Sequence, residues 1–263
     1  MGDAVLRGNL VPKDLEVYGR TDKGRVRPHN EDYFGHYVPP DIHIKNKWGS
    51  LFVVSDGVGG NAAGEVASAE AVNVLLQEYY FGDHTQRLPE RLKSVYQYTA
   101  MHVFDLSSSH PSVRNMQCTL TALLIRQNKF FISHVGDSKV FLLRSQKLMQ
   151  LTKDHTLVGK MVRLGLITPE AARTHPNKHL LLHALGEQPL LPADFYSGNI
   201  LPGDLFVLLT DGILEHMTEE ELKSFLLEKG YTDQGLKQLV NLINARGGYD
   251  NMTIMSVKVN EVN

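Results

Sequence analysis

The sequence is poor in cysteine and in long apolar runs. Cys118 is the only cysteine among 263 residues, so the chain cannot close an internal disulfide and must fold around a noncovalent core. No uninterrupted apolar run approaches the roughly 20 residues that span a bilayer, and the N-terminal residues lack the apolar segment of a signal peptide. We therefore expect a cytoplasmic protein with no membrane segment.

An excess of positive charge is also missing. The chain has 27 Lys and Arg against 29 Asp and Glu, a formal net charge of −2, and no local block of basic residues. It therefore lacks the electrostatic footprint of a nucleic-acid-binding protein. Its 42% hydrophobic and 21% charged residues are typical of a globular protein with a large core, and no linker-like segment divides it. We expect residues 1–263 to form a single domain.

Short apolar runs rich in β-branched and aromatic residues predict six strands. These runs are 51–54, 120–125, 130–135, 139–143, 205–209 and 253–259. Short turns separate neighbouring strands, which favours antiparallel sheets with packed helices over an alternating parallel fold. Segment 154–187 has few strand signals, and we expect it to protrude as a mixture of helix and loop.

Apolar residues at three- and four-residue steps predict four helices. These are a helix that starts near Gly64 and the segments 89–106, 218–228 and 233–245. The first helix is expected to bury a stripe formed by Val66, Ala69, Val72, Leu76 and Tyr79. Thr218 followed by Glu221 is typical of a capping box at a helix start.

The stretch VVSDGVGGNAAGE, residues 53–65, carries a glycine-rich turn after an apolar run. Gly57, Gly59 and Ala62 satisfy the short dinucleotide-binding fingerprint in its usual context between a strand and a helix. Electrostatics disfavours this interpretation, because Asp56 and Glu65 would flank a doubly negative pyrophosphate with no basic residue nearby. No Walker sequence occurs in the chain.

Carboxylates recur beside the predicted strands, which suggests a metal site instead. They are Asp56, Asp137, Asp211 and Asp250, together with Glu31 and Asp32 downstream of Arg27. Each one alone is a common turn residue. Crowded together, they would repel one another and raise their pKa values unless a cation neutralised them. Ligands that are all oxygen favour Mg²⁺ or Mn²⁺ over Zn²⁺.

Two other sites receive less support from the sequence. His175, His179 and His183 are spaced four residues apart, but Pro176 interrupts a regular helix and no carboxylate or cysteine nearby completes a zinc ligand set. We expect these histidines to have surface or packing roles. Cys118 is followed by Leu124 where a cysteine phosphatase needs its arginine, so a core cysteine is favoured.

Taken together, the motifs resemble those of the metal-dependent serine/threonine phosphatases of the PP2C (PPM) type, especially the bacterial members. They occur in the order of the family and cover about residues 20–257. The matching segments are TDKGRVRPHNEDYF (21–34), VVSDGVGGNAAGEVAS (53–68), CTLTALLI (118–125), SHVGDSKVFLLR (133–144), LTKDHTLV (151–158), HALG (183–186), GDLFVLLTDGI (203–213) and GGYDNMTIMSV (247–257).

The resemblance implies an α+β fold, a four-layer αββα sandwich of two antiparallel sheets flanked by helices. It also implies hydrolysis of phosphoserine and phosphothreonine in proteins by water activated at a dinuclear Mg²⁺ or Mn²⁺ centre, without a covalent intermediate. Phosphorylated proteins would be the substrates, a cognate serine/threonine kinase would be the partner, and the chain would be a monomer. Segment 154–187 would be a flap beside the metals.

The resemblance also assigns roles to individual residues. Asp56 would bridge the two metals, the Gly57 carbonyl would bind one of them, and Asp211 and Asp250 would bind the other. Glu31 and Asp32 would act directly or through metal-bound water. The remaining assignments are Asp137 for a third metal and Arg27 for the substrate phosphate.

Some positions depart from the family pattern. Val58 and Asn61 stand where relatives carry a histidine, and Gln117 stands where they carry a glycine. These departures leave open a non-catalytic regulator of the same fold that binds phosphoproteins. A hydrolase of small phosphoesters also stays open, because specificity would lie in segment 154–187.

Overall fold

The computed structural model describes residues 14–58, 63–83 and 85–261. Its strands form two sheets, and every pair of neighbouring strands is antiparallel. The first sheet has the order β1-β11-β10-β7-β8. Its strands are β1 (Leu15–Asp22), β11 (Met252–Val259), β10 (Leu205–Leu209), β7 (Lys139–Arg144) and β8 (Lys147–Gln150).

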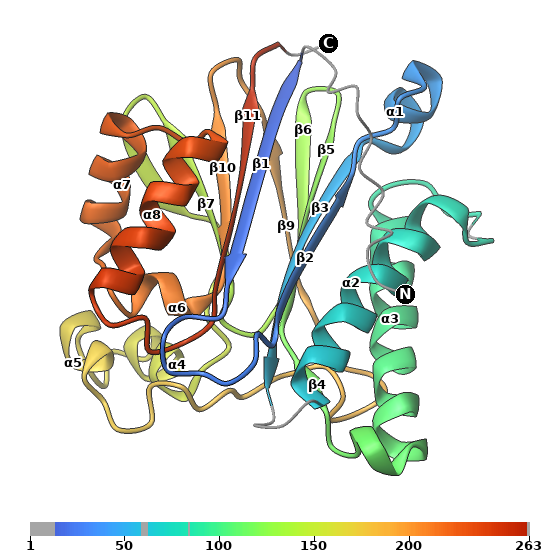
Figure 1. Cartoon of the computed structure of the whole chain (residues 1–263). Coiled ribbons are helices and arrows are strands. Elements are labelled where there is room, and N and C mark those ends of the chain that lie inside the picture. The colour runs from blue at the N-terminus through green and yellow to red at the C-terminus, as the bar shows by residue number, and fades with distance from the viewer. Residues whose placement is uncertain (1–13, 59–62, 84, 262–263) are drawn as a thin grey trace.

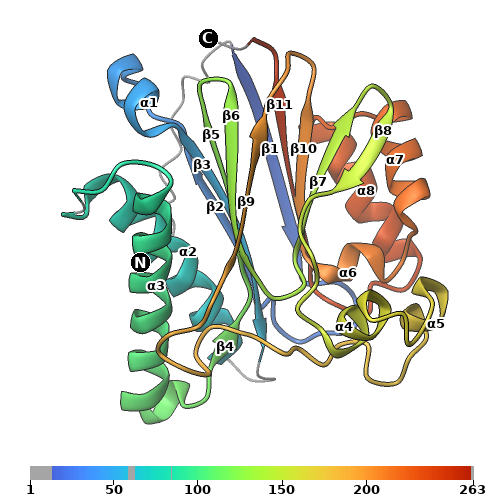
Figure 2. The ribbon, with the colours of Figure 1, turned by 180° about the vertical axis from the view of Figure 1, so that it is seen from behind.

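The second sheet has the order β2-β3-β5-β6-β9, with the short β4 paired to β3. Its strands are β2 (Asp32–Tyr37), β3 (Ser50–Val58), β5 (Leu120–Arg126), β6 (Lys129–Val135), β9 (Asp194–Asn199) and β4 (Gln117–Cys118). The two sheets pack face to face, as Figures 1 and 2 show from opposite sides.

Helices cover the outer face of each sheet, which gives four layers (Figure 1). The second sheet is covered by α2 (Ala63–Phe81) and α3 (Glu90–Ser109), and the first by α6 (Asp211–Leu214), α7 (Glu219–Glu228) and α8 (Asp233–Ala245). The remaining helices are α1 (Ile42–Trp48), η1 (Pro111–Val113), α4 (Leu157–Arg163) and α5 (Pro169–Arg173). Within the described residues, none of the helices has the length and apolar character needed to cross a membrane.

Three apolar cores hold these layers together. The central one lies between the sheets and contains Phe52, Phe130 and Phe206, with the last two rings edge to face at 5.3 Å. The outer cores join each sheet to its helices. The central strands β3, β5, β10 and β11 are therefore buried on both faces, which explains why they appear in the sequence as nearly continuous apolar runs.

The predicted αββα sandwich is confirmed. The predicted capping box is confirmed too, since Thr218 accepts the Glu221 N–H and the Glu221 side chain accepts the Thr218 N–H.

The buried stripe predicted for the helix after Gly64 was wrong in part. Val66 is 37% exposed, whereas Ala67 and Ala71 are fully buried against β3. Small residues let α2 approach the sheet closely, so the buried face follows alanines and not the bulkier valine.

The sandwich brings the carboxylate-bearing loops to one end. β2 begins and β3 ends there, β6 joins β7 there, and the segments after β10 and before β11 meet them. This end lies at the bottom of Figure 1, where α4 and α5 also lie.

The aromatic contact between the sheets generates a test of the fold. Replacing buried Phe206 by alanine should lower the free energy of unfolding by about 3–5 kcal/mol, because a cavity is left between two rigid sheets. Phe81→Ala is the matched control, since Phe81 is 66% exposed, and it should cost less than about 1 kcal/mol. Urea unfolding measures both values, and equal small losses would contradict the packing described.

Candidate metal centre

Strand pairing places the first two carboxylates together. Asp32 opens β2 and lies directly opposite Asp56 of β3. The backbone of Asp56 is fixed by Thr119, which receives the Asp56 N–H on Oγ1 at 2.9 Å and donates its own N–H to the Asp56 carbonyl at 2.8 Å. The position of Asp56 is therefore set by backbone contacts that leave its carboxylate free to face the cleft.

Gly57 follows at the point where β3 approaches two other segments. Its N–H donates to the Glu31 carbonyl at 3.0 Å. A Cβ at this position would lie 2.2 Å from the Gly64 carbonyl oxygen and 2.7 Å from that of Glu31. Glycine is required here because any side chain would push the Glu31 loop and the start of α2 apart.

The first sheet contributes Asp211, the first residue of α6, and Asp250, in the loop before β11. Asn251 joins this loop to the one that carries Arg27. Its side chain accepts the Glu31 N–H at 2.8 Å and donates to the carbonyls of Lys23 and His29 at 2.9 and 2.8 Å. Sequence reasoning missed this role, although the Asp-Asn pair that precedes the last strand was visible in the motif GGYDNMTIMSV.

Arg27 lies on the rim of the site. Its Nη2 donates to Asp250 Oδ2 at 2.8 Å, and its side chain is 45% exposed. The predicted phosphate-binding residue therefore lies beside the predicted metal ligands, in an ion pair of the kind that solvent weakens.

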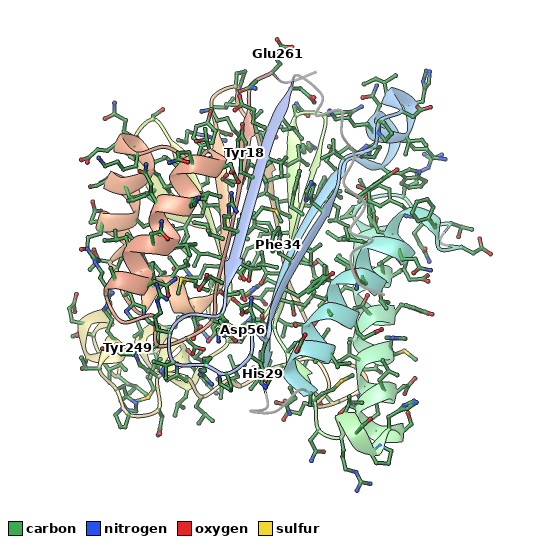
Figure 3. All side chains as sticks on the ribbon, viewed as in Figure 1. Tyr18, His29, Phe34, Asp56, Tyr249 and Glu261 are labelled. Carbon is green, nitrogen blue, oxygen red and sulfur yellow. The ribbon has the colours of Figure 1, made fainter. Side chains whose placement is uncertain are left out.

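These residues surround a cleft of about 370 Å³ between the two sheets. Asp56, His29 and Tyr249 mark this end of the sandwich in Figure 3. Asp32 lies behind the cleft and is 5% exposed. Arg27, His179, Tyr249 and Leu181 are among the other residues that line it. The carboxylates among the lining residues are Glu31, Asp56, Asp137, Asp211, Glu215 and Asp250.

Burial and mutual repulsion shift the pKa values of these acids. Burial, together with the charge of Asp211, raises the pKa of Asp32 to about 7 and that of Asp137 to about 8. Burial also raises the pKa of Asp56 well above its usual range. Asp211 is only partly buried, and although burial acts to raise its pKa, hydrogen bonding and positive charge from His179 lower it.

The residues present fit a hard divalent cation. Asp32 Oδ1 is buried and has no hydrogen-bond partner among the described residues, a costly arrangement that a cation or its water would relieve. The cleft offers many carboxylate oxygens, and Gly57, which has no side chain of its own, is also part of its lining. Oxygen donors of this kind match Mg²⁺ and Mn²⁺.

His179 and Glu215 belong to the cleft, which the sequence did not predict. The histidines of segment 175–183 were expected to lack carboxylate neighbours, but His179 lies within 3.5 Å of Asp211 Oδ2 and 3.2 Å of Glu215 Oε1. These carboxylates come from α6 and its C-terminal cap, far away in sequence, so a search of neighbouring residues could not find them.

Of the two positions where relatives carry a histidine, Val58 is described by the structure and Asn61 is not. Val58 lines the cleft at the end of β3. Gly59, Gly60 and Asn61 lie outside the described residues.

Protein stripped of divalent cations should lose stability as pH rises from about 4 to about 8. Asp32 and Asp137 have pKa values of about 7 and about 8 in the fold, against about 3.9 in an unfolded chain. Between these values the folded state binds more protons, so removing them with rising pH costs stability. Calorimetric Tm values in EDTA at pH 5 and 8 test this, with Mn²⁺ at pH 8 as the restoring control. A Tm in EDTA that is higher at pH 8 would contradict the repulsion.

Comparison with known proteins identifies the family to which the chain belongs. Residues 25–232 match the family described as protein phosphatase 2C. A serine/threonine phosphatase stp of Listeria monocytogenes is 33% identical over 243 residues, which cover 91% of this chain and 94% of that protein. The crystal structure of the Mycobacterium tuberculosis serine/threonine phosphatase PstP/Ppp has a TM-score of 0.82 at 30% identity and covers 94% of this chain and 100% of its own. The catalytic domain of PstP in complex with two manganese ions has a TM-score of 0.79 at 29% identity, with 94% and 99% covered. The chain belongs to the protein phosphatase 2C family.

Proposed function

We propose that the protein hydrolyses phosphoserine and phosphothreonine in proteins at a dinuclear Mg²⁺ or Mn²⁺ centre. The observation that carries the proposal is the convergence of carboxylates from both sheets on one cleft, with Arg27 at its rim. Relatives covering most of the chain are named serine/threonine phosphatases, and one of them holds two manganese ions.

The family resemblance assigns the ligands, and the lining of the cleft supports this assignment. Asp56 and the Gly57 carbonyl would hold one ion, and Asp211 and Asp250 the other, with Asp56 between them. Glu31 lies beside Gly57, where its backbone is fixed by Asn251 and Ser68. When bound, the two ions would neutralise the phosphoryl oxygens and lower the pKa of the attacking water.

The chain's own residues then orient the reactants. Arg27 can offer two parallel N–H groups to a phosphate, and its contact with Asp250 keeps the guanidinium at the edge of the cleft. Asp32, opposite Asp56 in the strand pair, accepts the Thr210 hydroxyl at 2.8 Å, and this contact orients the carboxylate, which would hold the attacking water. Without cations, six carboxylates facing the same cleft would repel a phosphate.

Asp137 supports a third, looser ion. It lies in the turn between β6 and β7 and lines the cleft, and the charge of Asp211 raises its pKa. Lys139 donates to the Asp137 carbonyl at 3.1 Å and to Asp154 Oδ2 at 2.6 Å, so this turn is tied to the start of segment 154–187.

Segment 154–187 is proposed as the flap that recognises protein substrates. His179 and Leu181 line the cleft, so the segment reaches the site itself. The single-domain organisation, the cognate kinase, the monomeric state and the cytoplasmic location stay predictions.

Asp211→Asn should lower kcat/KM for a phosphothreonine peptide with Mn²⁺ by more than about 100-fold, since groups that merely support metal ligands already contribute 10–100-fold. EDTA should abolish turnover by the unchanged protein. Asp233→Asn is the matched control, because Asp233 is an exposed α8 carboxylate paired with Arg20 and should leave the rate intact. Full activity in Asp211→Asn, or in EDTA, would reject the proposal.

Arg27→Lys tests the phosphate contact separately. Lysine keeps the charge but loses the paired N–H groups, so kcat/KM should fall about 10-fold to 100-fold, or about 1.5–3 kcal/mol, the range for one hydrogen bond to a charged group. Arg25→Lys, an exposed neighbour, should have little effect. Steady-state kinetics on the same peptide measures both variants, and equal rates would show that Arg27 does not contact the phosphate.

A further inference from the structure

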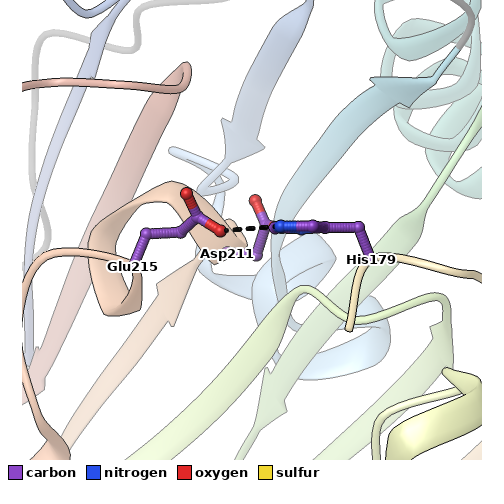
Figure 4. A group of neighbouring side chains, drawn as sticks. All are labelled: His179, Asp211 and Glu215. Carbon is purple, nitrogen blue, oxygen red and sulfur yellow. Dashed lines mark ion pairs between the residues drawn. The ribbon is translucent and has the colours of Figure 1, made fainter. Parts of the chain in front are cut away.

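His179 brings an imidazole into a site otherwise built from oxygen ligands. Nδ1 lies 3.5 Å from Asp211 Oδ2, and Nε2 lies 3.2 Å from Glu215 Oε1. Figure 4 shows the ring pointing toward the two carboxylates, which come from α6 and its C-terminal cap. One donor atom from each residue lies within 4.8 Å of the other two.

We propose that His179, Asp211 and Glu215 bind a transition-metal ion of the Zn²⁺ or Mn²⁺ type through one nitrogen and two carboxylate oxygens. The inference rests on the proposed function, because Asp211 would be shared with the dinuclear centre. A carboxylate has two oxygens, and Asp211 directs Oδ2 toward His179, so the other oxygen can serve the dinuclear centre.

The spacing of the three side chains suits one ion. Zn²⁺ binds nitrogen and oxygen at about 2.0–2.2 Å, so two ligands of one ion lie at most about 4.4 Å apart. The contacts of 3.5 and 3.2 Å involve different nitrogens of the ring, and one donor atom from each residue lies within 4.8 Å of the other two. A small rotation of the exposed His179 side chain would therefore bring one nitrogen and both carboxylates to a single ion. The imidazole would bind through one nitrogen and leave its other nitrogen to hydrogen-bond a neighbouring group or water, an arrangement that orients metal-bound histidines in general.

Local helical structure holds the two carboxylates on one side. Glu215 follows Asp211 by four residues, and its N–H donates to the Asp211 carbonyl at 3.1 Å. Both side chains are partly buried, at 24% and 16% exposure, whereas His179 is 51% exposed on the flap. The flap therefore supplies one ligand and the body of the protein supplies two.

The nitrogen ligand gives this site a different metal preference from that of the dinuclear centre. Imidazole suits zinc and other transition metals, whereas Mg²⁺ prefers oxygen ligands and retains its water. An ion at His179 would tether segment 154–187 to α6, and Mg²⁺ would not do so. Occupancy of the flap site would then depend on which divalent ion is present.

Lys178 competes with an ion for the same ligand. Its Nζ lies 3.1 Å from Glu215 Oε1, the oxygen that faces His179. An ion on this oxygen would displace the ammonium group, which is free to move because the side chain is 37% exposed. Removing the Lys178 charge should therefore tighten metal binding, while removing His179 should weaken it.

The experiment uses the full chain loaded with Mn²⁺ and examined by electron spin echo envelope modulation. The unchanged protein should show ¹⁴N modulation from a directly bound histidine, and His179→Gln should lose it. His183→Gln is the matched control on the same segment, since the His183 ring packs against His155, and it should keep the modulation. In a titration with Zn²⁺, His179→Gln should weaken binding at least about 10-fold, and Lys178→Gln should strengthen it.

Other outcomes overturn the proposal. Two or more bound Mn²⁺ ions without ¹⁴N modulation would mean that the dinuclear centre exists and His179 is only an ion-pair partner. Modulation that persists in His179→Gln would assign the nitrogen to another residue. Absence of all Mn²⁺ binding would reject the proposed function as well, and circular dichroism of each variant verifies that it is folded.

Discussion

Repulsion among carboxylates at one end of the sandwich is the constraint on which the site depends. Two sheets that pack through apolar cores bring acids from separate loops into a shared cleft. Burial then raises the pKa values of Asp32, Asp56 and Asp137, so the apo protein stores an electrostatic cost where divalent cations would bind. The scaffold must be rigid enough to hold acids that repel one another.

Hydrogen bonds to the backbone provide that rigidity. Thr119 holds Asp56 from one side, and Asn251 ties the Glu31 backbone to the loop before β11. The two sheets are thus joined across the cleft by polar contacts as well as by aromatic packing. Loops that carry ligands are usually mobile, and these bonds explain how this set could be preorganised before any ion binds.

Much of this could be predicted from the sequence. Continuous apolar runs such as LFVLL predicted buried strands, and the acids at their ends predicted a metal site, which stays a proposal. β1, β2 and β9 were missed because they are only partly buried and their sequences alternate or carry polar residues. His179 was missed because it meets Asp211 and Glu215 only after the flap folds back on α6, a long-range contact that local spacing does not encode. Glu215 lies four residues after Asp211, and only the fold shows that it lines the cleft.

The central claim is that the cleft between the sheets is a dinuclear divalent metal centre. Crystals soaked in Mn²⁺ test it most directly, through anomalous diffraction recorded near the manganese edge. The account predicts two strong anomalous peaks, one beside Asp56 and Gly57 and one beside Asp211 and Asp250, with Asp56 touching both. A cleft without an anomalous peak at saturating Mn²⁺ would contradict it.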